Sequence, residues 1–108
     1  MEELVLRLIG ESRIQQAVAM NTLDNGLHIF AYPLHDGVLV AMGLGHDAPL
    51  SPGDVLRRRA GDLPRLGGWL PSLFNDGSIY LVRRLTSEEE EGGEPLAQQL
   101  ALAQELLN

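Results

Sequence analysis

Two strand-like runs separated by a short turn signal restrict the fold of this chain more than any other feature. Leu27 to Leu34 and Val38 to Leu44 are apolar, and Asp36-Gly37 lies between them. A dipeptide of this kind fits the type I′ turn of a β-hairpin. Alternation divides the side chains of the first run into two sets: Leu27, Ile29 and Ala31 on one face, and His28, Phe30 and Tyr32 on the other. The pattern therefore predicts an antiparallel hairpin, and with it a β-sheet.

Three further segments are candidates for strands. Residues 14–20 form a weak candidate, because alanine and glutamine are poor strand formers, and Asp24-Asn25-Gly26 after them is a strong turn signal. Residues 67–74 and 78–85 stand on either side of a second hairpin signal, Asn75-Asp76-Gly77. We therefore expect five strands, most of them paired with their neighbours in sequence.

Helices are predicted before the first strand and between the third and fourth strands. Apolar residues at helical spacing predict a helix over residues 2–10, with an extension to residue 16 as the alternative. Ser51 can cap a second helix, Pro52 suits its first position, and Asp54 favours the positive end of its dipole. This helix should end at about residue 60 or 63, because Pro64 disfavours helical geometry at the residue before it.

The C-terminal part combines an acidic run with a leucine-rich helix. The glutamates Glu88 to Glu91 repel one another and stay solvated, which predicts an exposed acidic loop over residues 86–94. Pro95 then opens a helix. Its expected buried stripe has helical spacing and consists of Leu96, Leu100, Ala103 and Leu107.

The expected order is helix, three strands, helix, two strands, helix, in a single domain over residues 1–108. Helices packed on an antiparallel sheet define the α+β class. We therefore predict a five-stranded, mainly antiparallel sheet with three helices.

Charge and composition argue against several classes of function. The formal net charge is −7, with eight arginines and no lysine, so the chain repels phosphate backbones and anionic membranes. Arg57-Arg58-Arg59 is the only basic cluster, and consecutive helical residues point in different directions, so it forms no single patch. The chain has no cysteine, no run as apolar as a membrane span, and no basic segment before its first apolar residues. We therefore expect a cytoplasmic protein without disulfides, membrane insertion, a signal peptide or general nucleic-acid binding.

Catalytic and ligand-binding motifs are missing from the chain. It contains no phosphate-binding loop and no G-x-S-x-G motif, and Gly43-Leu44-Gly45 lacks the third glycine of a dinucleotide site. The histidines match no metal-ligand spacing. They are His28, His35 and His46, of which the last two precede Asp36 and Asp47. We therefore expect no catalysis, no cofactor and no metal.

The central hairpin carries apolar residues on both of its faces. One face can pack on helices, and the other must be covered or left exposed. Exposed apolar surfaces usually mark interaction sites. The sequence is compatible with two arrangements. In one, the sheet is enclosed by its own helices; in the other, it has one free binding face.

One segment is similar to a known family. Phe74-Asn75-Asp76-Gly77-Ser78-Ile79-Tyr80-Leu81-Val82-Arg83-Arg84-Leu85 turns through Asp-Gly and then runs along an apolar strand that ends in a basic pair. With the predicted order of elements, the acidic charge, the acidic loop and the leucine-rich last helix, the chain resembles the class I chaperones of bacterial type III secretion.

The resemblance implies a dimeric cytoplasmic chaperone that uses no ATP. It would keep the N-terminal segment of a secreted effector or export-control protein extended, as a homodimer or as a heterodimer with a second small chaperone. By analogy and from predicted exposure, the client-binding residues are Leu4, Leu8, Leu27, Ile29 and Phe30. The predicted subunit interface consists of Val55, Leu56, Arg59, Trp69 and Leu70. Ordinary core packing is the alternative for each of these residues.

Two other functions compete with a chaperone. An adaptor or regulatory subunit with a similar sheet would bind a folded partner. A small-molecule-binding domain would need a closed pocket with converging polar groups, and the sequence offers no such set.

Overall fold

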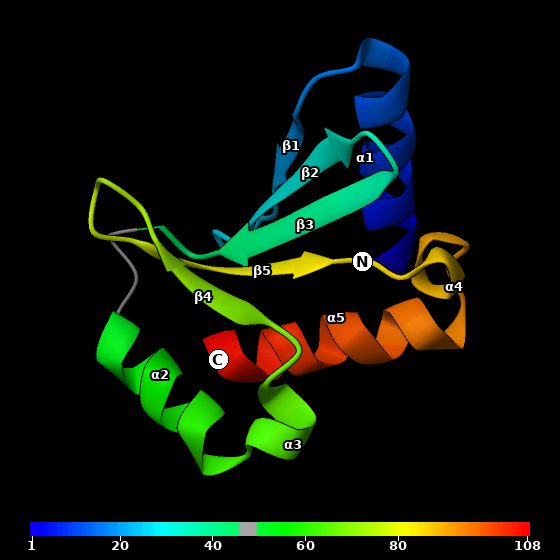
Figure 1. Cartoon of the computed structure of the whole chain (residues 1–108). Helices are drawn as coiled ribbons and strands as arrows, with labels where there is room; N and C mark the ends of the chain where they lie inside the picture. Colours follow the sequence, from blue (N-terminus) through cyan, green and yellow to red (C-terminus); the bar gives the residue numbers. More distant parts are fainter. Residues whose placement is uncertain (46–49) are drawn as a thin grey trace.

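A computed structural model describes residues 1–45 and 50–108, and within these ranges the chain forms five strands and five helices (Figure 1). In chain order they are α1 (Glu2–Gln15), β1 (Ala19–Thr22), β2 (His28–Leu34), β3 (Gly37–Gly43), α2 (Pro52–Gly61), α3 (Leu63–Leu66), β4 (Leu70–Leu73), β5 (Ile79–Arg84), α4 (Ser87–Glu90) and α5 (Glu94–Leu107). The α+β class is confirmed. The two short helices α3 and α4 add to the three helices expected.

The strands form one sheet in the order β1-β2-β3-β5-β4, in which every neighbouring pair is antiparallel. The predicted central hairpin is confirmed as β2 and β3. Its turn differs from the prediction, because Leu34 pairs with Gly37 and leaves His35 and Asp36 as the two-residue loop. Neither loop residue has a positive φ, whereas a type I′ turn needs positive φ at both central positions. The prediction of a type I′ turn centred on Asp36-Gly37 is therefore wrong.

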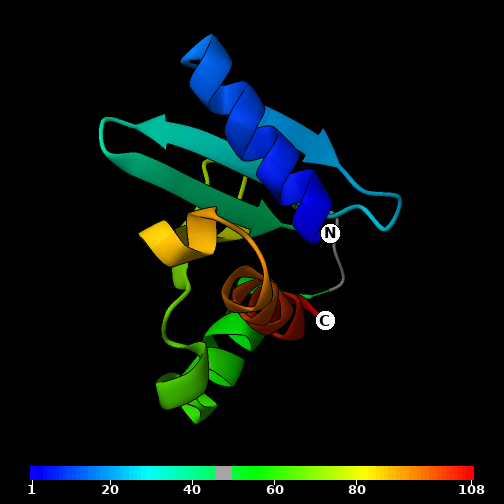
Figure 2. The ribbon, with the colours of Figure 1, turned by 90° about the vertical axis from the view of Figure 1, so that its right-hand side faces the viewer.

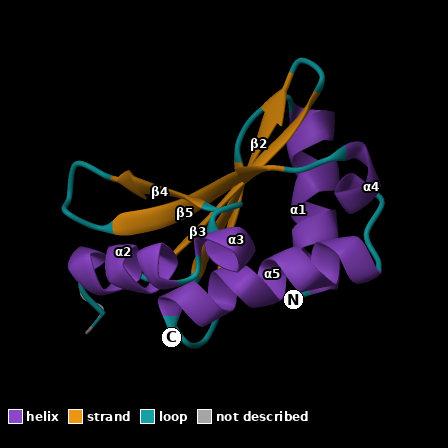
Figure 3. Ribbon diagram, turned by 60° about the horizontal axis from the view of Figure 1, so that its bottom comes forward, coloured by secondary structure: helices purple, strands orange, loops and turns teal. Residues whose placement is uncertain are grey.

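Helices cover one face of the sheet. Figure 3 shows α1, α2, α3 and α5 on the same side of the strands, and Figure 2 shows α1 crossing in front of the strands with α5 seen end-on below them. Side chains that point to this side are buried, among them Ile29, Val40 and Leu81. Their helical partners in the core include Val5, Leu8, Leu96, Leu100 and Leu106. In the described part of the chain, no helix lies over the opposite face, so the domain has two layers.

Helix α1 extends past Gly10 to Gln15, as in the longer of the two alternatives. Ser12 is buried and donates its hydroxyl to the Ile9 carbonyl over 2.8 Å. Gln16 ends the helix in the left-handed conformation, with φ of 52°. A glycine inside a helix costs about 1 kcal/mol, and the packing of the last turns on the sheet offsets this cost. The strand predicted over residues 14–20 is therefore wrong before Ala19, where β1 begins.

Helix α2 begins as predicted, at a complete capping box. The Asp54 N–H donates to Ser51 Oγ over 3.2 Å, and the Ser51 N–H donates to Asp54 Oδ2 over 3.2 Å. After α2 ends at Gly61, α3 starts at once, with Pro64 in its first turn, where its missing N–H leaves no hydrogen bond unmade. The strand predicted over residues 67–74 is shorter than expected and spans only β4.

The acidic segment over residues 86–94 is not an exposed loop throughout. Residues Ser87–Glu90 form α4, and Thr86 caps this helix by accepting the Glu89 N–H over 3.1 Å. Glu89 is buried and accepts two hydrogen bonds from Arg83, over 3.1 and 2.8 Å. The prediction of an exposed loop is therefore wrong at Glu89, because the Thr86 cap and the Arg83 guanidinium stabilise this carboxylate in the interior.

Helix α5 packs on the core through the predicted stripe of apolar residues. Its buried residues are Leu96, Leu100, Ala103, Leu106 and Leu107. The Trp69 indole donates its Nε1–H to the Gln99 carbonyl over 2.9 Å, which ties α5 to the chain before β4.

Candidate protein-interaction surface

The uncovered side of the sheet, here called the open face, carries the side chains that alternate with the buried ones. Strand register brings them together. Its members are Met20, Thr22, His28, Phe30, Tyr32, Leu39, Ala41, Gly43, Leu70, Ser72, Tyr80, Val82 and Arg84, joined by Phe74 just after β4. Only His28 and Arg84 among them can carry charge. The open face is therefore largely apolar.

Both phenylalanines and both tyrosines of the chain belong to the open face. The Phe30 ring lies 6.0 Å from Tyr32 and 5.5 Å from Tyr80, centroid to centroid. Phe74 stacks on Tyr80 at 4.2 Å. These are the separations of favourable aromatic pairs. We call Phe30, Tyr32, Phe74 and Tyr80 the aromatic cluster.

The aromatic cluster crosses the sheet because the strand between its members has small residues. Phe30 lies on β2 and Tyr80 on β5, with β3 between these strands. Facing them from β3 are Ala41, opposite Phe30, and Gly43, opposite Tyr80. Both are buried although no helix covers them, because the rings meet above them. The small residues of β3 thus allow the cluster to form.

Replacing Gly43 with alanine is expected to disrupt this arrangement. A Cβ at this position would lie 2.7 Å from a ring carbon of Tyr80 and 2.8 Å from the Ile79 carbonyl oxygen, which cannot move away. Overpacking of this kind costs about 1–3 kcal/mol of unfolding free energy. The urea midpoint, followed by Trp69 fluorescence, measures the loss.

Gly10→Ala is the matched control for Gly43→Ala. A Cβ at Gly10 would meet no atom within 4 Å, and Gly10 lies inside a helix. Alanine should therefore raise the unfolding free energy by about 0.5–1 kcal/mol. Equal effects of the two substitutions would show that Tyr80 does not lie against Gly43.

Tyr80 is the most enclosed member of the aromatic cluster. Burial raises the pKa of its phenol, and the negative charge of Asp76 and the neighbouring Tyr32 raise the pKa further. The phenol therefore stays protonated at physiological pH.

The two edges of the sheet differ in how easily another strand could pair with them. Edge strand β1 contains no proline and no charged residue, and it exposes Met20 at 59%. Ile14 in the last turn of α1 and Val18 just before β1 are exposed as well. Edge strand β4 contains Pro71, which has no N–H to donate. Natural edges are usually protected by charge or proline, so β1 is the edge open to strand addition.

The predicted client-binding residues are only partly on the surface. Leu8, Leu27 and Ile29 are buried in the chain's own core, so their assignment as client contacts is wrong. In the alternating pattern, Leu27 and Ile29 point to the opposite side of the sheet from Phe30, and the helices cover the side of Leu27 and Ile29. Leu4 is half-buried against the core, while Phe30 lies on the open face.

The predicted subunit interface divides in the same way. Val55 and Trp69 are fully buried, so they cannot meet a second subunit, and their assignment is wrong. Leu56 and Leu70 are exposed at 48% and 59%. The Arg59 guanidinium donates to the carbonyls of Trp69 and Gly67, over 2.9 and 3.2 Å, which fixes α2 to the chain before β4.

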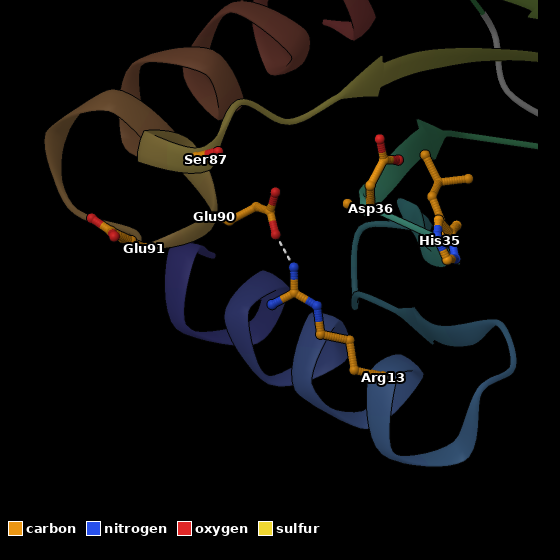
Figure 4. A pocket seen from close by; sticks show the side chains of 8 residues that line it. Arg13, His35, Asp36, Ser87, Glu90 and Glu91 are labelled. Atoms are coloured by element: carbon orange, nitrogen blue, oxygen red, sulfur yellow. Dashed lines mark ion pairs between the residues drawn. The ribbon is translucent and has the colours of Figure 1, made fainter.

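A polar hollow lies between the tip of the β2–β3 hairpin, α4 and the end of α1 (Figure 4). Arg13 reaches from α1 to Glu90 of α4. Asp36 at the hairpin tip pairs with Arg84 over 2.6 Å. Both arginines are engaged by the chain's own carboxylates, so these ion pairs hold the hairpin tip, α4 and α1 together.

The other candidate residues from the sequence do not come together to form a binding site. Thr22 Oγ1 and His28 Nδ1 are 2.9 Å apart, and His35 occupies the hairpin tip. His46 and Asp47 lie outside the described residues. Among the described residues, no group of histidine and acidic side chains could hold a metal ion. No helix in the described ranges is long and apolar enough to cross a membrane.

Sequence reasoning missed most of the aromatic cluster. Phe30 was singled out, but Tyr32, Phe74 and Tyr80 were not. A usable signal was present, because Phe30 and Tyr32 belong to one alternating set in 27–34, and the small residues Ala41 and Gly43 belong to one alternating set in 38–44. The strand order, which places β5 beside β3, was the missing information.

No protein-family model, curated protein or solved structure matches this chain.

Proposed function

We propose that this chain is a non-catalytic protein-binding domain of the cytoplasm that works as a type III secretion chaperone does. It holds an N-terminal segment of a secreted effector or export-control protein in an extended form and keeps it competent for export. The observation that carries the proposal is the open face. This sheet surface gathers every phenylalanine and tyrosine of the chain, exposes Met20 and Leu70 at 59% each, and has no described helix over it, which supports a role in interaction.

The edge of β1 supports an extended partner. A client strand can pair with β1 through backbone hydrogen bonds, while its alternate side chains pack on Met20 and Phe30, which lie opposite each other. Strand pairing needs an extended segment, so this geometry favours a chaperone over an adaptor that binds a folded domain.

The exposed Leu56 and Leu70 support a second contact, between subunits. They are the two predicted interface residues with free apolar surface. A contact through α2 and the edge strand β4 would cover Leu70 at one margin of the open face and leave β1 and β2 available in a homodimer or in a heterodimer with a second small chaperone.

Size-exclusion chromatography with light scattering tests the proposal. The chain would be measured alone, and then after co-expression with N-terminal segments of proteins secreted by the same cell. We expect a dimer, and a soluble complex in which one segment is protected from protease yet gives no signal of a folded domain. A monomer that ignores every segment, or a complex with folded domains only, would overturn the chaperone proposal.

Three variants locate the contact. Phe30→Ser and Leu39→Ser change the open face, and each should weaken client binding by at least about tenfold. Leu63→Ser on α3 is the control, since Leu63 is exposed but lies on the helical side. Trp69 fluorescence verifies that each variant is folded. Equal binding by all three variants would remove the open face from the proposal.

A further inference from the structure

The outer edge of strand β1 presents the backbone groups of two residues. No described strand lies beyond β1 in the sheet. The Leu23 N–H donates to the Leu27 carbonyl over 2.8 Å, and hydrogen-bonded pairs recur at every second residue of an antiparallel ladder. Asn21, two residues before Leu23, therefore bonds to β2. The N–H and C=O groups of Met20 and Thr22, on either side of Asn21, point outward.

This outward pattern is complementary to itself. Consider a second copy that lies antiparallel to the first, with Asn21 at a two-fold axis. Met20 of each copy then faces Thr22 of the other. Facing residues whose backbone groups point toward each other exchange both hydrogen bonds, so the outward groups of both residues are satisfied. A two-fold contact of this kind closes on itself and adds no third copy.

The other edge of the sheet lacks this match. The Phe74 N–H donates to the Ser78 carbonyl over 2.8 Å, so by the same alternation Pro71 and Leu73 are the outward residues of β4. A copy paired about Ser72 would set Pro71 opposite Leu73. Since Pro71 has no N–H, the Leu73 carbonyl would then lack a donor. Pairing between copies is therefore favoured at β1.

The side chains at the β1 edge also suit a second copy. The strand carries no charged residue, so two chains of net charge −7 can meet there without setting like charges face to face. Asp24 follows β1, so the aspartates of the two copies lie at opposite ends of the paired strands. Met20 is 59% exposed opposite Phe30, and pairing buries it against Thr22 of the other copy.

The size of this contact sets its strength. A strand of 4 residues buries far less than the roughly 1,200 Å² of a stable interface. The net charge of each chain also opposes the encounter. The pair is therefore weak, with a dissociation constant above about 1 μM, and another extended segment can displace it.

We propose that β1 pairs with β1 of a second copy about Asn21, and that this pair shields the edge until an extended client takes its place. An uncharged edge without proline is otherwise open to unwanted pairing. The pairing of copies stands on the edge alone, whereas the exchange with a client rests on the proposed function. One edge accepts one strand at a time, so copy and client compete.

A disulfide between copies tests the pairing, because the chain contains no cysteine. In an Asn21→Cys variant, the two substituted residues form a pair that is not hydrogen-bonded, with Cα atoms about 4.5 Å apart, within the range of a disulfide. In the control Thr22→Cys they are diagonal neighbours about 7–8 Å apart, beyond that range. With oxidised glutathione as oxidant, Asn21→Cys should form covalent dimers at least about tenfold faster than Thr22→Cys. Equal rates would overturn the pairing.

Proline variants identify the backbone groups responsible. Met20→Pro removes an outward N–H but none that bonds to β2, and should slow the cross-linking of Asn21→Cys at least about fivefold. Leu73→Pro removes an outward N–H from β4 and should change the rate by less than about 1.5-fold. Trp69 fluorescence verifies that both variants are folded. Added salt should speed cross-linking, because it screens the repulsion between the two acidic chains.

A peptide of residues 17–24 separates this inference from the proposed function. In excess it should slow the cross-linking of Asn21→Cys at least about fivefold, because it competes for the edge. If cross-linking is fast but the peptide does not slow it, the exchange is wrong and the pairing of copies stands. If a client segment binds but Asn21→Cys reacts no faster than Thr22→Cys, the inference fails and the proposed function stands.

Discussion

Replacing Trp69 with alanine is expected to lower the free energy of unfolding by about 3–5 kcal/mol. Trp69 has no exposed surface, and its indole N–H is satisfied by the Gln99 carbonyl. The substitution leaves a cavity between β4 and α5 and an unpaired carbonyl. Since small domains are stable by about 5–15 kcal/mol, the variant should be partly unfolded at physiological temperature. Urea unfolding followed by far-ultraviolet circular dichroism measures the effect.

Leu73→Ala is the matched control, because Leu73 lies four residues further along the chain and is 68% exposed. Its unfolding free energy should stay within about 0.5 kcal/mol of the parent value. A subunit-interface role for Trp69 would give a different signature, since the stability of the parent and its loss in the variant would then depend on protein concentration. A loss below about 1.5 kcal/mol, or one that varies with concentration, would contradict the core position of Trp69.

Replacing Arg83 with methionine is expected to cost about 3–5 kcal/mol, because it leaves Glu89 buried without its partner. The side chains of Arg83 and Glu89 are only 17% and 7% exposed. Arg83 also donates to the Gly68 carbonyl over 3.0 Å, so one guanidinium joins β5, α4 and the chain before β4. Urea midpoints at neutral pH measure the loss.

Two comparisons isolate the buried pair. Arg84→Met breaks the exposed pair with Asp36 and should cost at most about 1 kcal/mol. The double variant Arg83→Met/Glu89→Met should recover most of the loss, since two apolar side chains can replace a buried pair at little cost. If the double variant is as unstable as Arg83→Met, the unpaired buried charge of Glu89 is not the cause of the lost stability.

The same pair gives a dependence of stability on pH. Burial alone would raise the pKa of Glu89, but hydrogen bonds from Arg83 and from the Thr86 N–H outweigh burial and hold this pKa below its usual value of 4.5. The folded state therefore binds the proton less tightly than the unfolded state. The resulting stabilisation is complete above the unfolded-state pKa and is lost as the pH falls through the folded-state pKa. A Glu89→Gln variant should lose less stability than the parent between neutral and acid pH.

The sequence predicted the parts of the fold that depend on neighbouring residues. Alternation in 27–34 identified β2, and Ser51-Pro52 with Asp54 identified the start of α2, because a hairpin and a capping box are local devices. Residues 14–18 were assigned wrongly, since Gly10 was taken as a helix end. The contacts that carry α1 past Gly10 are made to β1 and β2, which no local pattern reveals.

The candidate site was harder to predict, for a similar reason. Alternation correctly separated Phe30 from Leu27 and Ile29, but only the packing of the helices decides which set is covered. Glu89 was assigned to a solvated run because its neighbours are also glutamates. Its burial depends on Arg83, which approaches through the tertiary fold and not through sequence proximity alone.

The pairing of β3 with β5 has a consequence for how this domain tolerates change. Among the described strands it is the only ladder between strands that are not consecutive in the chain, and within it Gly43 pairs with Tyr80. The entropy of closing that connection grows only logarithmically with its length, by about 0.6 kcal/mol for each doubling. Loop-closure entropy therefore sets little limit on the length of this connection outside the core residues of α2 and α3. The two hairpins on either side, closed by tight turns, allow no such freedom, so variation in length among chains of this architecture should collect between β3 and β4.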